Sequence, residues 1–323
     1  MKRNTVVWLV LAGAIVLVVG ALFVLALAMA NWDISSLGFK KFVTETVEIG
    51  EKAERVEVLS ETADVTLVPS KDGHCRVTFC VREDYTRTAA VKSGTLQIEA
   101  RKEGNGFSLS DIFSFGSSEI TVELPAGEYE SLSVTGATGD VVIPGDYRFN
   151  EMQIAVSTGK VECNASVTGR AEITGSTGRI TAENMKAGEI RFTLSTGRIL
   201  LQSVDCTGNV QLKSTTGAME LTDVRCRDFS SDASTGRLTM KNVLAEGQMT
   251  IERSTGDVSF DACDAAELFV KTSTGDVTGT LRSEKVFATG STTGRIEVPE
   301  TVTGGKCKIT TTTGDIRIGI SGQ

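Results

Sequence analysis

Proline and histidine are scarce in this chain of 323 residues, which contains four prolines and one histidine. Proline lacks the N–H that a β-ladder needs, so the absence of proline between residues 145 and 298 is compatible with continuous strand pairing. The single histidine, His74, lies in the turn-like segment 71–74, and a Ser-His-Asp triad would depend on it alone. We expect a solvated turn residue there, because no partner motif accompanies it.

Nucleotide-binding and metal-binding motifs are also missing. The glycines do not open helices, which excludes a P-loop or a dinucleotide fingerprint, and there is no CxxC or Cys/His cluster with metal-ligand spacing. The formal net charge is −8, and no basic run occurs. This balance argues against nucleic acid and anionic lipid headgroups as partners. We therefore expect no nucleic acid, no metal and no cofactor.

What the chain does contain is the dipeptide Thr-Gly, repeated ten times at intervals of 19 or 20 residues. Its glycines are Gly139, Gly159, Gly178, Gly197, Gly217, Gly236, Gly256, Gly275, Gly294 and Gly314. Such regular self-similarity is typical of a stacked repeat protein. Glycine suits a sharp corner because it tolerates positive φ and close backbone approach, and the neighbouring Ser and Thr can hydrogen-bond the corner backbone.

Apolar and polar residues alternate on both sides of each Thr-Gly. The second residue after the glycine is apolar in all ten repeats, and apolar residues recur seven and five residues before it, as at Ile190 and Phe192. This period of two indicates one strand before the corner and one after it. We predict an all-β fold, a single-stranded parallel β-solenoid with about 19–20 residues per rung, where a rung is one turn of the coil. The crossover rule favours a right-handed coil.

Seven cysteines are an odd number, so a complete set of intramolecular disulfides is impossible. Cys206 and Cys226 occupy equivalent places in neighbouring repeats and should stack. A disulfide between them is conceivable, but small apolar residues fill this place in other repeats. We therefore expect these cysteines to pack in the core.

The N-terminus carries a long apolar segment over residues 5–30, enough for a helix that spans a bilayer. Lys2 and Arg3 precede it, and Trp8 and Trp32 flank it, which predicts a single-pass span with a cytoplasmic N-terminus and the rest of the chain outside the cytoplasm. A cleaved signal peptide is the alternative, although its apolar region would normally be shorter. We divide the chain into an anchor (1–30), a juxtamembrane stalk (31–42), a degenerate β region (43–130) and regular rungs (131–323).

The degenerate region contains weaker copies of the repeat. Residues 56–58 and 64–67 fit the two strands of a rung, with Ala63 in the place of the glycine. Residues 93–98 and 118–122 both fit the second strand. We interpret 43–130 as an irregular start of the same solenoid, because a solenoid needs atypical terminal turns. The C-terminus ends without an evident cap, which would leave a strand edge open to end-to-end self-association.

Two features are candidate binding surfaces. The first is the segment 104–116, which interrupts the pattern and carries the apolar residues Phe107, Ile112, Phe113 and Phe115. It is either a loop that contacts a partner or a membrane, or a flap that covers part of the solenoid.

The second is the column of residues directly after each Thr-Gly, which we call the +1 position and which is charged in nine of ten repeats. Sequential stacking would pair Arg237 with Asp257 and Arg295 with both Asp276 and Asp315. It would also place Asp257 beside Asp276. Two carboxylates are too few for the 6–8 ligands of Ca²⁺, so we expect solvated, paired charges.

The recurring unit Ser-Thr-Gly-Asp/Arg-Ile/Val, as in Ser195–Leu201 and Ser273–Val277, resembles a bacterial family of exported domains of unknown function described as "putative adhesin". The strand Glu119–Pro125 is also similar to that family, and the resemblance covers about residues 43–323. It implies a β-solenoid and, through LiaX-like and YvlB-like relatives, a sensing or regulatory role in cell-envelope stress. It implies no catalytic residues, and this chain differs in having its own membrane span.

We therefore expect a membrane-anchored, extracytoplasmic β-solenoid that binds or scaffolds a cell-envelope protein or a cell-wall polymer, and that contacts the lipid bilayer through residues 5–30. We expect a binding protein rather than an enzyme. The alternative is a polysaccharide-acting β-helix enzyme, for which Asp257 and Asp276 would be the first residues to test.

Overall fold

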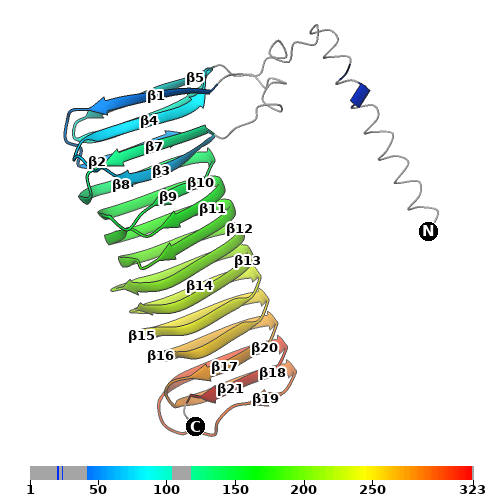
Figure 1. Ribbon diagram of the computed structural model, residues 1–323. Helices are drawn as coiled ribbons and strands as arrows, with labels where there is room; N and C mark the ends of the chain where they lie inside the picture. The colour runs from blue at the N-terminus through cyan, green and yellow to red at the C-terminus, as the bar shows by residue number, and fades with distance from the viewer. Residues whose placement is uncertain (1–19, 22–23, 25–41, 104–117, 322–323) are drawn as a thin grey trace.

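The computed structural model describes residues 20, 21, 24, 42–103 and 118–321, and the last two ranges form a rod of stacked β-strands (Figure 1). The strands of the irregular N-terminal region are β1 (Phe42–Ile49), β2 (Arg55–Ser60), β3 (Ala63–Pro69), β4 (Cys75–Arg82), β5 (Tyr85–Lys92), β6 (Thr95–Lys102) and β7 (Ser118–Leu124). The regular rungs contain β8 (Gly127–Thr138), β9 (Val141–Ile143), β10 (Tyr147–Cys163), β11 (Ser166–Glu183), β12 (Lys186–Cys206), β13 (Asn209–Cys226), β14 (Asp228–Thr235), β15 (Leu238–Thr255) and β16 (Val258–Thr274). The C-terminal rungs contain β17 (Val277–Leu281), β18 (Lys285–Thr293), β19 (Ile296–Glu297), β20 (Gly305–Thr313) and β21 (Ile316–Ile320).

The regular rungs stack in parallel and in register, which confirms the predicted β-solenoid. Gly159 pairs with Gly178, Gly178 with Gly197, and Gly197 with Gly217. The Thr-Gly dipeptides therefore form a single file along the rod. The handedness of the coil stays a prediction.

The core runs along the inside of the coil. The second residue after each Thr-Gly glycine is buried in nine of the ten repeats, and the exception is Ile296, which is 42% exposed. Residues five and seven before the glycine are also largely buried, as are those in the return segment, for example Val204 and Cys206. Because every segment buries the same side, one continuous apolar core stabilises all rungs.

Two kinds of corner shape the regular rungs, the first in all ten repeats and the second in five of them. At the predicted corner, all ten Thr-Gly glycines have φ between 139° and 158°, a region that side chains rarely adopt. The second corner is built without glycine and lies six residues further along. There, five non-glycine residues adopt the left-handed region with φ of 51–55°, in which Asn and Asp are the best tolerated. They are Asn184, Ser203, Asp223, Asn242 and Ala262.

The N-terminal end interleaves its rungs. The strand pair β2 and β3 lies between the regular rung β8–β9 and an outermost rung made by β6 and β7. Gly139 stacks on Ala63, which confirms Ala63 in the place of the glycine. The assignment of residues 93–98 to a second strand is wrong: Leu96 pairs with Val56, so β6 is the first strand of its rung, because β7 already fills the second-strand position.

An antiparallel cap closes this end. β4 pairs antiparallel with β7, β1 pairs antiparallel with β4, and β5 pairs antiparallel with β6. These strands cover the outermost parallel rung at the end of Figure 1 nearest β1. In this direction the solenoid therefore ends on short antiparallel strands rather than on an open parallel edge.

The C-terminal end is also interleaved, which corrects the expected sequential stacking. β16 pairs with β20 and β17 with β21, while β18 and β19 pair on the far side of β20 and β21. The rung of Gly314 thus lies between those of Gly275 and Gly294, and the outermost rung is the penultimate one in the sequence. This explains why Ile296, on that outermost rung, is partly exposed.

All seven cysteines are free, and five of them are buried, which confirms packing over disulfide formation for Cys206 and Cys226. The predicted membrane span lies almost entirely outside the described residues. Within the described part of the chain, no helix has the length and apolarity needed to cross a membrane.

Candidate functional site

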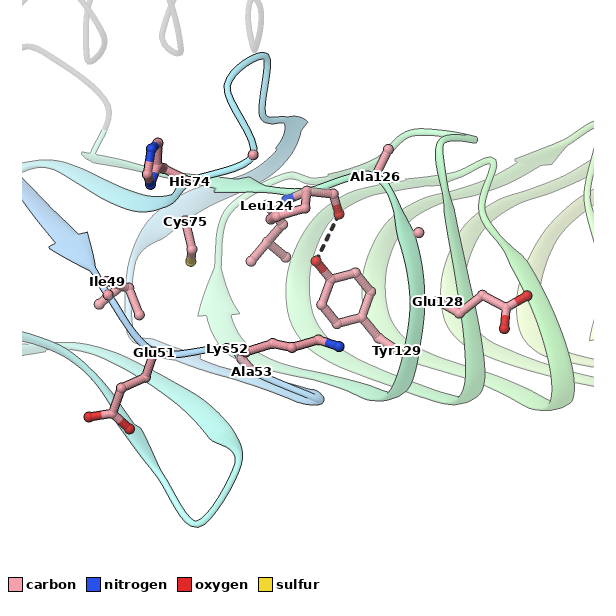
Figure 2. A pocket seen from close by; sticks show the side chains of 14 residues that line it. Ile49, Glu51, Lys52, Ala53, His74, Cys75, Leu124, Ala126, Glu128 and Tyr129 are labelled. Carbon is pink, nitrogen blue, oxygen red and sulfur yellow. Dashed lines mark hydrogen bonds between the residues drawn. The ribbon is translucent and has the colours of Figure 1, made fainter.

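A pocket of about 380 Å³ lies where the cap meets the solenoid (Figure 2). Three connections line it: residues 49–53 between β1 and β2, residues 73–75 before β4, and residues 124–129 between β7 and β8. Each connection has to leave the rung pattern, because each links strands that are not successive neighbours in the stack. The pocket is the space between these three connections.

Local pairing explains how the walls are held. Ile49, the last residue of β1, lies opposite Cys75, the first residue of β4, and beyond this pair the two strands separate. On the other side, the crossover after Leu124 passes the interleaved rung to reach β8. Figure 2 shows Ile49 and Cys75 on the cap side of the pocket, Leu124 and Tyr129 on the solenoid side, and Lys52 extending between them.

An aromatic cluster supports the solenoid side. The Tyr129 hydroxyl donates a hydrogen bond to the Pro125 carbonyl at 2.8 Å, which fixes the crossover. The ring of Tyr129 lies 6.2 Å from that of Tyr147 and 5.9 Å from that of Phe149, within the range of favourable aromatic pairs. Tyr147 and Phe149 are fully buried, so Tyr129 packs against the core on this side of the pocket.

A charged turn supports the opposite wall. The carboxylate of Asp72 accepts hydrogen bonds from the backbone N–H of His74 and from the Arg76 side chain, and Arg76 also contacts Glu123 at 3.2 Å. The hydrogen bonds from Arg76, followed by that from His74, hold the pKa of Asp72 well below its usual range. The turn therefore keeps its charges at any physiological pH, and it places the exposed imidazole of His74 at the pocket.

Two titratable groups of the pocket wall, Cys75 and Tyr129, have raised pKa values. Burial, and then the charge of Glu123, raises the pKa of the Cys75 thiol to about 11. Burial also raises the pKa of Tyr129 to about 12. A reactive cysteine needs a lowered pKa, because the thiolate is the nucleophile. Cys75 and Tyr129 are therefore neutral wall groups at neutral pH.

The candidate aspartates lie far along the rod from this pocket. Asp257 forms the predicted ion pair with Arg237 at 3.5 Å. The predicted contact between Asp276 and Arg295 is wrong, because interleaving places Asp315 between them. Arg295 does neighbour Asp315, but the contact is a hydrogen bond from the Arg295 backbone N–H to Asp315 Oδ1 at 2.7 Å.

Three aspartates thus stack on successive rungs. Hydrogen bonds from backbone N–H groups offset the repulsion between their carboxylates. Asp257 Oδ1 accepts the backbone N–H of Asp276 at 3.1 Å, and Asp276 Oδ1 accepts that of Asp315 at 2.8 Å. Each carboxylate is therefore partly neutralised by the next rung. In the part of the chain that the structure covers, no group of three or more His, Cys, Asp or Glu side chains is placed to bind a metal.

The other sequence candidates, Phe107, Ile112, Phe113 and Phe115, lie outside the described residues, so the role of segment 104–116 stays a prediction. Sequence reasoning missed the cap pocket. The available signal was weak: Gly73, Pro125 and Gly127 mark connections that break the 19–20-residue rhythm, but they do not reveal that these connections meet.

The fold defines a class, that of parallel β-solenoid repeat proteins, here with an interleaved, capped end and a pocket beneath the cap. A family profile described as Toastrack DUF4097 matches residues 53–217 and 207–323. The chain therefore belongs to the Toastrack DUF4097 family, consistent with the resemblance of its Ser-Thr-Gly units to adhesin-type domains.

Three solved structures are similar to this chain at low identity. A "putative lipid binding protein" from Parabacteroides distasonis is 16% identical, with 86% of this chain and 97% of that chain covered and a TM-score of 0.45. A "putative adhesin" from Bacteroides fragilis is 13% identical (87% and 97% covered, TM-score 0.35), and another from Parabacteroides distasonis is 12% identical (87% and 98% covered, TM-score 0.38). No curated protein matches the chain.

Proposed function

We propose that this chain is a membrane-anchored binding protein of the bacterial cell envelope. Residues 5–30 anchor it, the N-terminus is cytoplasmic, and the solenoid projects outside the cytoplasm, where it binds or scaffolds an envelope component and contributes to envelope-stress sensing. The apolar N-terminal sequence and the exported character of the resembling domains support this proposal.

The cap pocket is the observation that carries the binding role. Its walls combine apolar groups, such as Ile49 and Leu124, with the cation of Lys52, while Glu51 and Glu128 lie at its rim with their carboxylates turned outward (Figure 2). Apolar walls with a few polar groups are typical of ligand pockets. Charges of both signs at one pocket suit a ligand that itself carries an amine and a carboxylate. A short peptide-bearing fragment of the cell wall has this chemistry.

A thermal-shift titration of the full chain in a non-ionic detergent tests this site. The probe is a mixture of peptidoglycan fragments released by a muramidase. We expect the fragments to raise the melting temperature of the wild type and of Ala90→Trp, an exposed alanine on β5 outside the pocket. Ala126→Trp, at an exposed alanine that lines the pocket, should fold but lose the shift. An equal shift for both variants, or no shift in the wild type, contradicts the proposal.

The predicted topology has a separate test. On intact cells, a protease that cannot cross the membrane should degrade the solenoid while the N-terminus stays protected.

Deleting residues 104–116 tests the role of this segment as a loop that contacts a partner. If it contacts an envelope protein, the deletion removes that protein from a pull-down with the anchored chain. Recovery of the same protein from the deletion variant would exclude the loop as the contact.

A further inference from the structure

A second concave surface lies on the Thr-Gly ridge, halfway along the rod and away from the cap. It is a groove of about 460 Å³ that runs from Arg198 past Ala218 and Arg237 to Asp257, with Thr235, Thr239 and Thr255 along it. Glu220 also lines it, so two arginines and two carboxylates face the groove. Ala218 is the one uncharged residue of the +1 column. Where other rungs place a long charged side chain, this rung leaves space.

The column around the groove is locally cationic, although the whole chain carries a formal net charge of −8. Lys160, Arg179 and Arg198 occupy the +1 position of successive rungs, followed by Ala218 and Arg237. Acidic residues bound this stretch: Asp140 precedes Lys160, and Asp257 follows Arg237. The ridge therefore presents a basic strip over five rungs.

Each of the two arginines at the groove contacts one carboxylate and keeps further N–H donors for a ligand. Arg198 lies 3.6 Å from Glu220, and Arg237 lies 3.5 Å from Asp257, so each guanidinium has one carboxylate neighbour. A guanidinium has five N–H donors, and one such contact leaves several free to meet a ligand. The side chains are 48% and 67% exposed, which makes those donors accessible.

The distance between the two arginines indicates how the charged groups of a ligand would be spaced. Arg198 and Arg237 are two rungs apart, or roughly 10 Å at the usual strand spacing. Pairs of exposed Ser and Thr hydroxyls repeat beside them on every rung from that of Gly159 to that of Gly314. Such a surface fits an extended polymer that carries hydroxyls along its length and an anionic group at intervals.

We propose that the Ala218 groove binds an anionic glycan or polyol chain, with a phosphate or carboxylate group seated between Arg198 and Arg237 and hydroxyls bonded to the threonines. This site extends the proposed envelope-binding role to a polymer and uses none of the residues of the cap pocket.

Binding is measured by calorimetry with the full chain in a non-ionic detergent at fixed ionic strength. One probe is an oligomer of glycerol phosphate, another is an oligogalacturonate, and a neutral cello-oligosaccharide serves as the uncharged comparison. We expect at least one anionic probe to bind, with the stronger of the two identifying phosphodiester or carboxylate as the preferred group. Binding of neither, or equal binding of the neutral probe, overturns the proposal.

Three variants separate a built groove from general charge attraction. Arg237→Gln should weaken binding about tenfold, the size expected for one charge-assisted hydrogen bond. Lys241→Gln removes an equally exposed cation elsewhere on the surface and should change affinity less than twofold.

Ala218→Arg is the decisive variant, because it adds positive charge while filling the groove. Neighbouring rungs carry arginine at this position, so the variant should fold, and circular dichroism checks this. We expect it to abolish binding. Tighter or unchanged binding would show that only charge attracts the polymer and would refute the groove. Ala126→Trp, which blocks the cap pocket, should bind these polymer probes as the wild type does, so failure of one site is distinguishable from failure of the other.

Discussion

The Thr-Gly corner makes a sharp prediction about stability at Gly256. This glycine has φ of 141°, a conformation that side chains rarely adopt. A Cβ added there would lie 2.6 Å from the carbonyl carbon of Gly236 on the preceding rung and still closer to its oxygen. The rungs would have to separate locally. That movement would strain the hydrogen bonds from Gly256 N–H to Thr274 O at 2.8 Å and from Gly236 N–H to Thr255 O at 2.9 Å.

The expected cost of Gly256→Ala follows from these contacts. Backbone strain contributes about 1–3 kcal/mol, and two weakened hydrogen bonds contribute about 1 kcal/mol each. We therefore expect a loss of about 3–5 kcal/mol in the free energy of unfolding, measured by urea denaturation followed by circular dichroism. Gly290→Ala is the matched control, because no atom lies within 4 Å of its added Cβ and its φ is not positive. If the two variants lose the same stability, the stacked-corner account is refuted.

Three further changes test other parts of the fold. Arg253 is 4% exposed, and its Nε and Nη1 atoms find no protein acceptor among the described residues. Arg253→Met should therefore raise the free energy of unfolding by about 1–2 kcal/mol, measured by urea denaturation. A lower free energy of unfolding would contradict this. Lys285 Nζ lies 2.7 Å from Asp264 Oδ1, and the lysine side chain is 4% exposed. Lys285→Met should therefore lower the free energy of unfolding by about 3 kcal/mol. A thermal melt that matches the wild type would rule out this contribution. Burial raises the pKa of three core thiols to about 12, from an ordinary value of 9.0. They belong to Cys163, Cys226 and Cys307. The unfolded chain releases these protons first, so stability is fully present below pH 9 and should fall between pH 9 and 12 by about 1.4 kcal/mol per pH unit for each thiol. Urea titrations at several pH values check this, and a Cys163→Ala variant with an unchanged slope would exclude the cause.

The repeat was predictable because its cause is local. A corner that requires glycine and a core that requires an apolar residue two positions later leave the same mark in every rung, and stacking follows from that period. The second corner left no comparable mark, because Asn184, Ser203 and Ala262 share a left-handed backbone but not a residue type.

The interleaved ends were not predictable from the period. The repeat containing Asp315 has the same spacing and pattern as its predecessor, and nothing local indicates that the chain folds back to insert it beside Asp276. The expected contacts of Arg295 were wrong for this reason. The cap pocket was missed on similar grounds, since it depends on three connections that are distant in sequence and meet only in the folded protein.

The two surfaces differ in what makes them selective. The cap pocket is enclosed by irregular connections and suits a small ligand, whereas the Ala218 groove is open and continues along a periodic ridge.

Amide hydrogen exchange of the full chain, with and without muramidase-released peptidoglycan fragments, tests most directly whether the cap junction binds an envelope ligand. Slower exchange confined to residues 49–53, 73–75 and 124–129 is the predicted result. Unchanged exchange in these three connections, with protection elsewhere on the rod or none at all, would contradict the central claim.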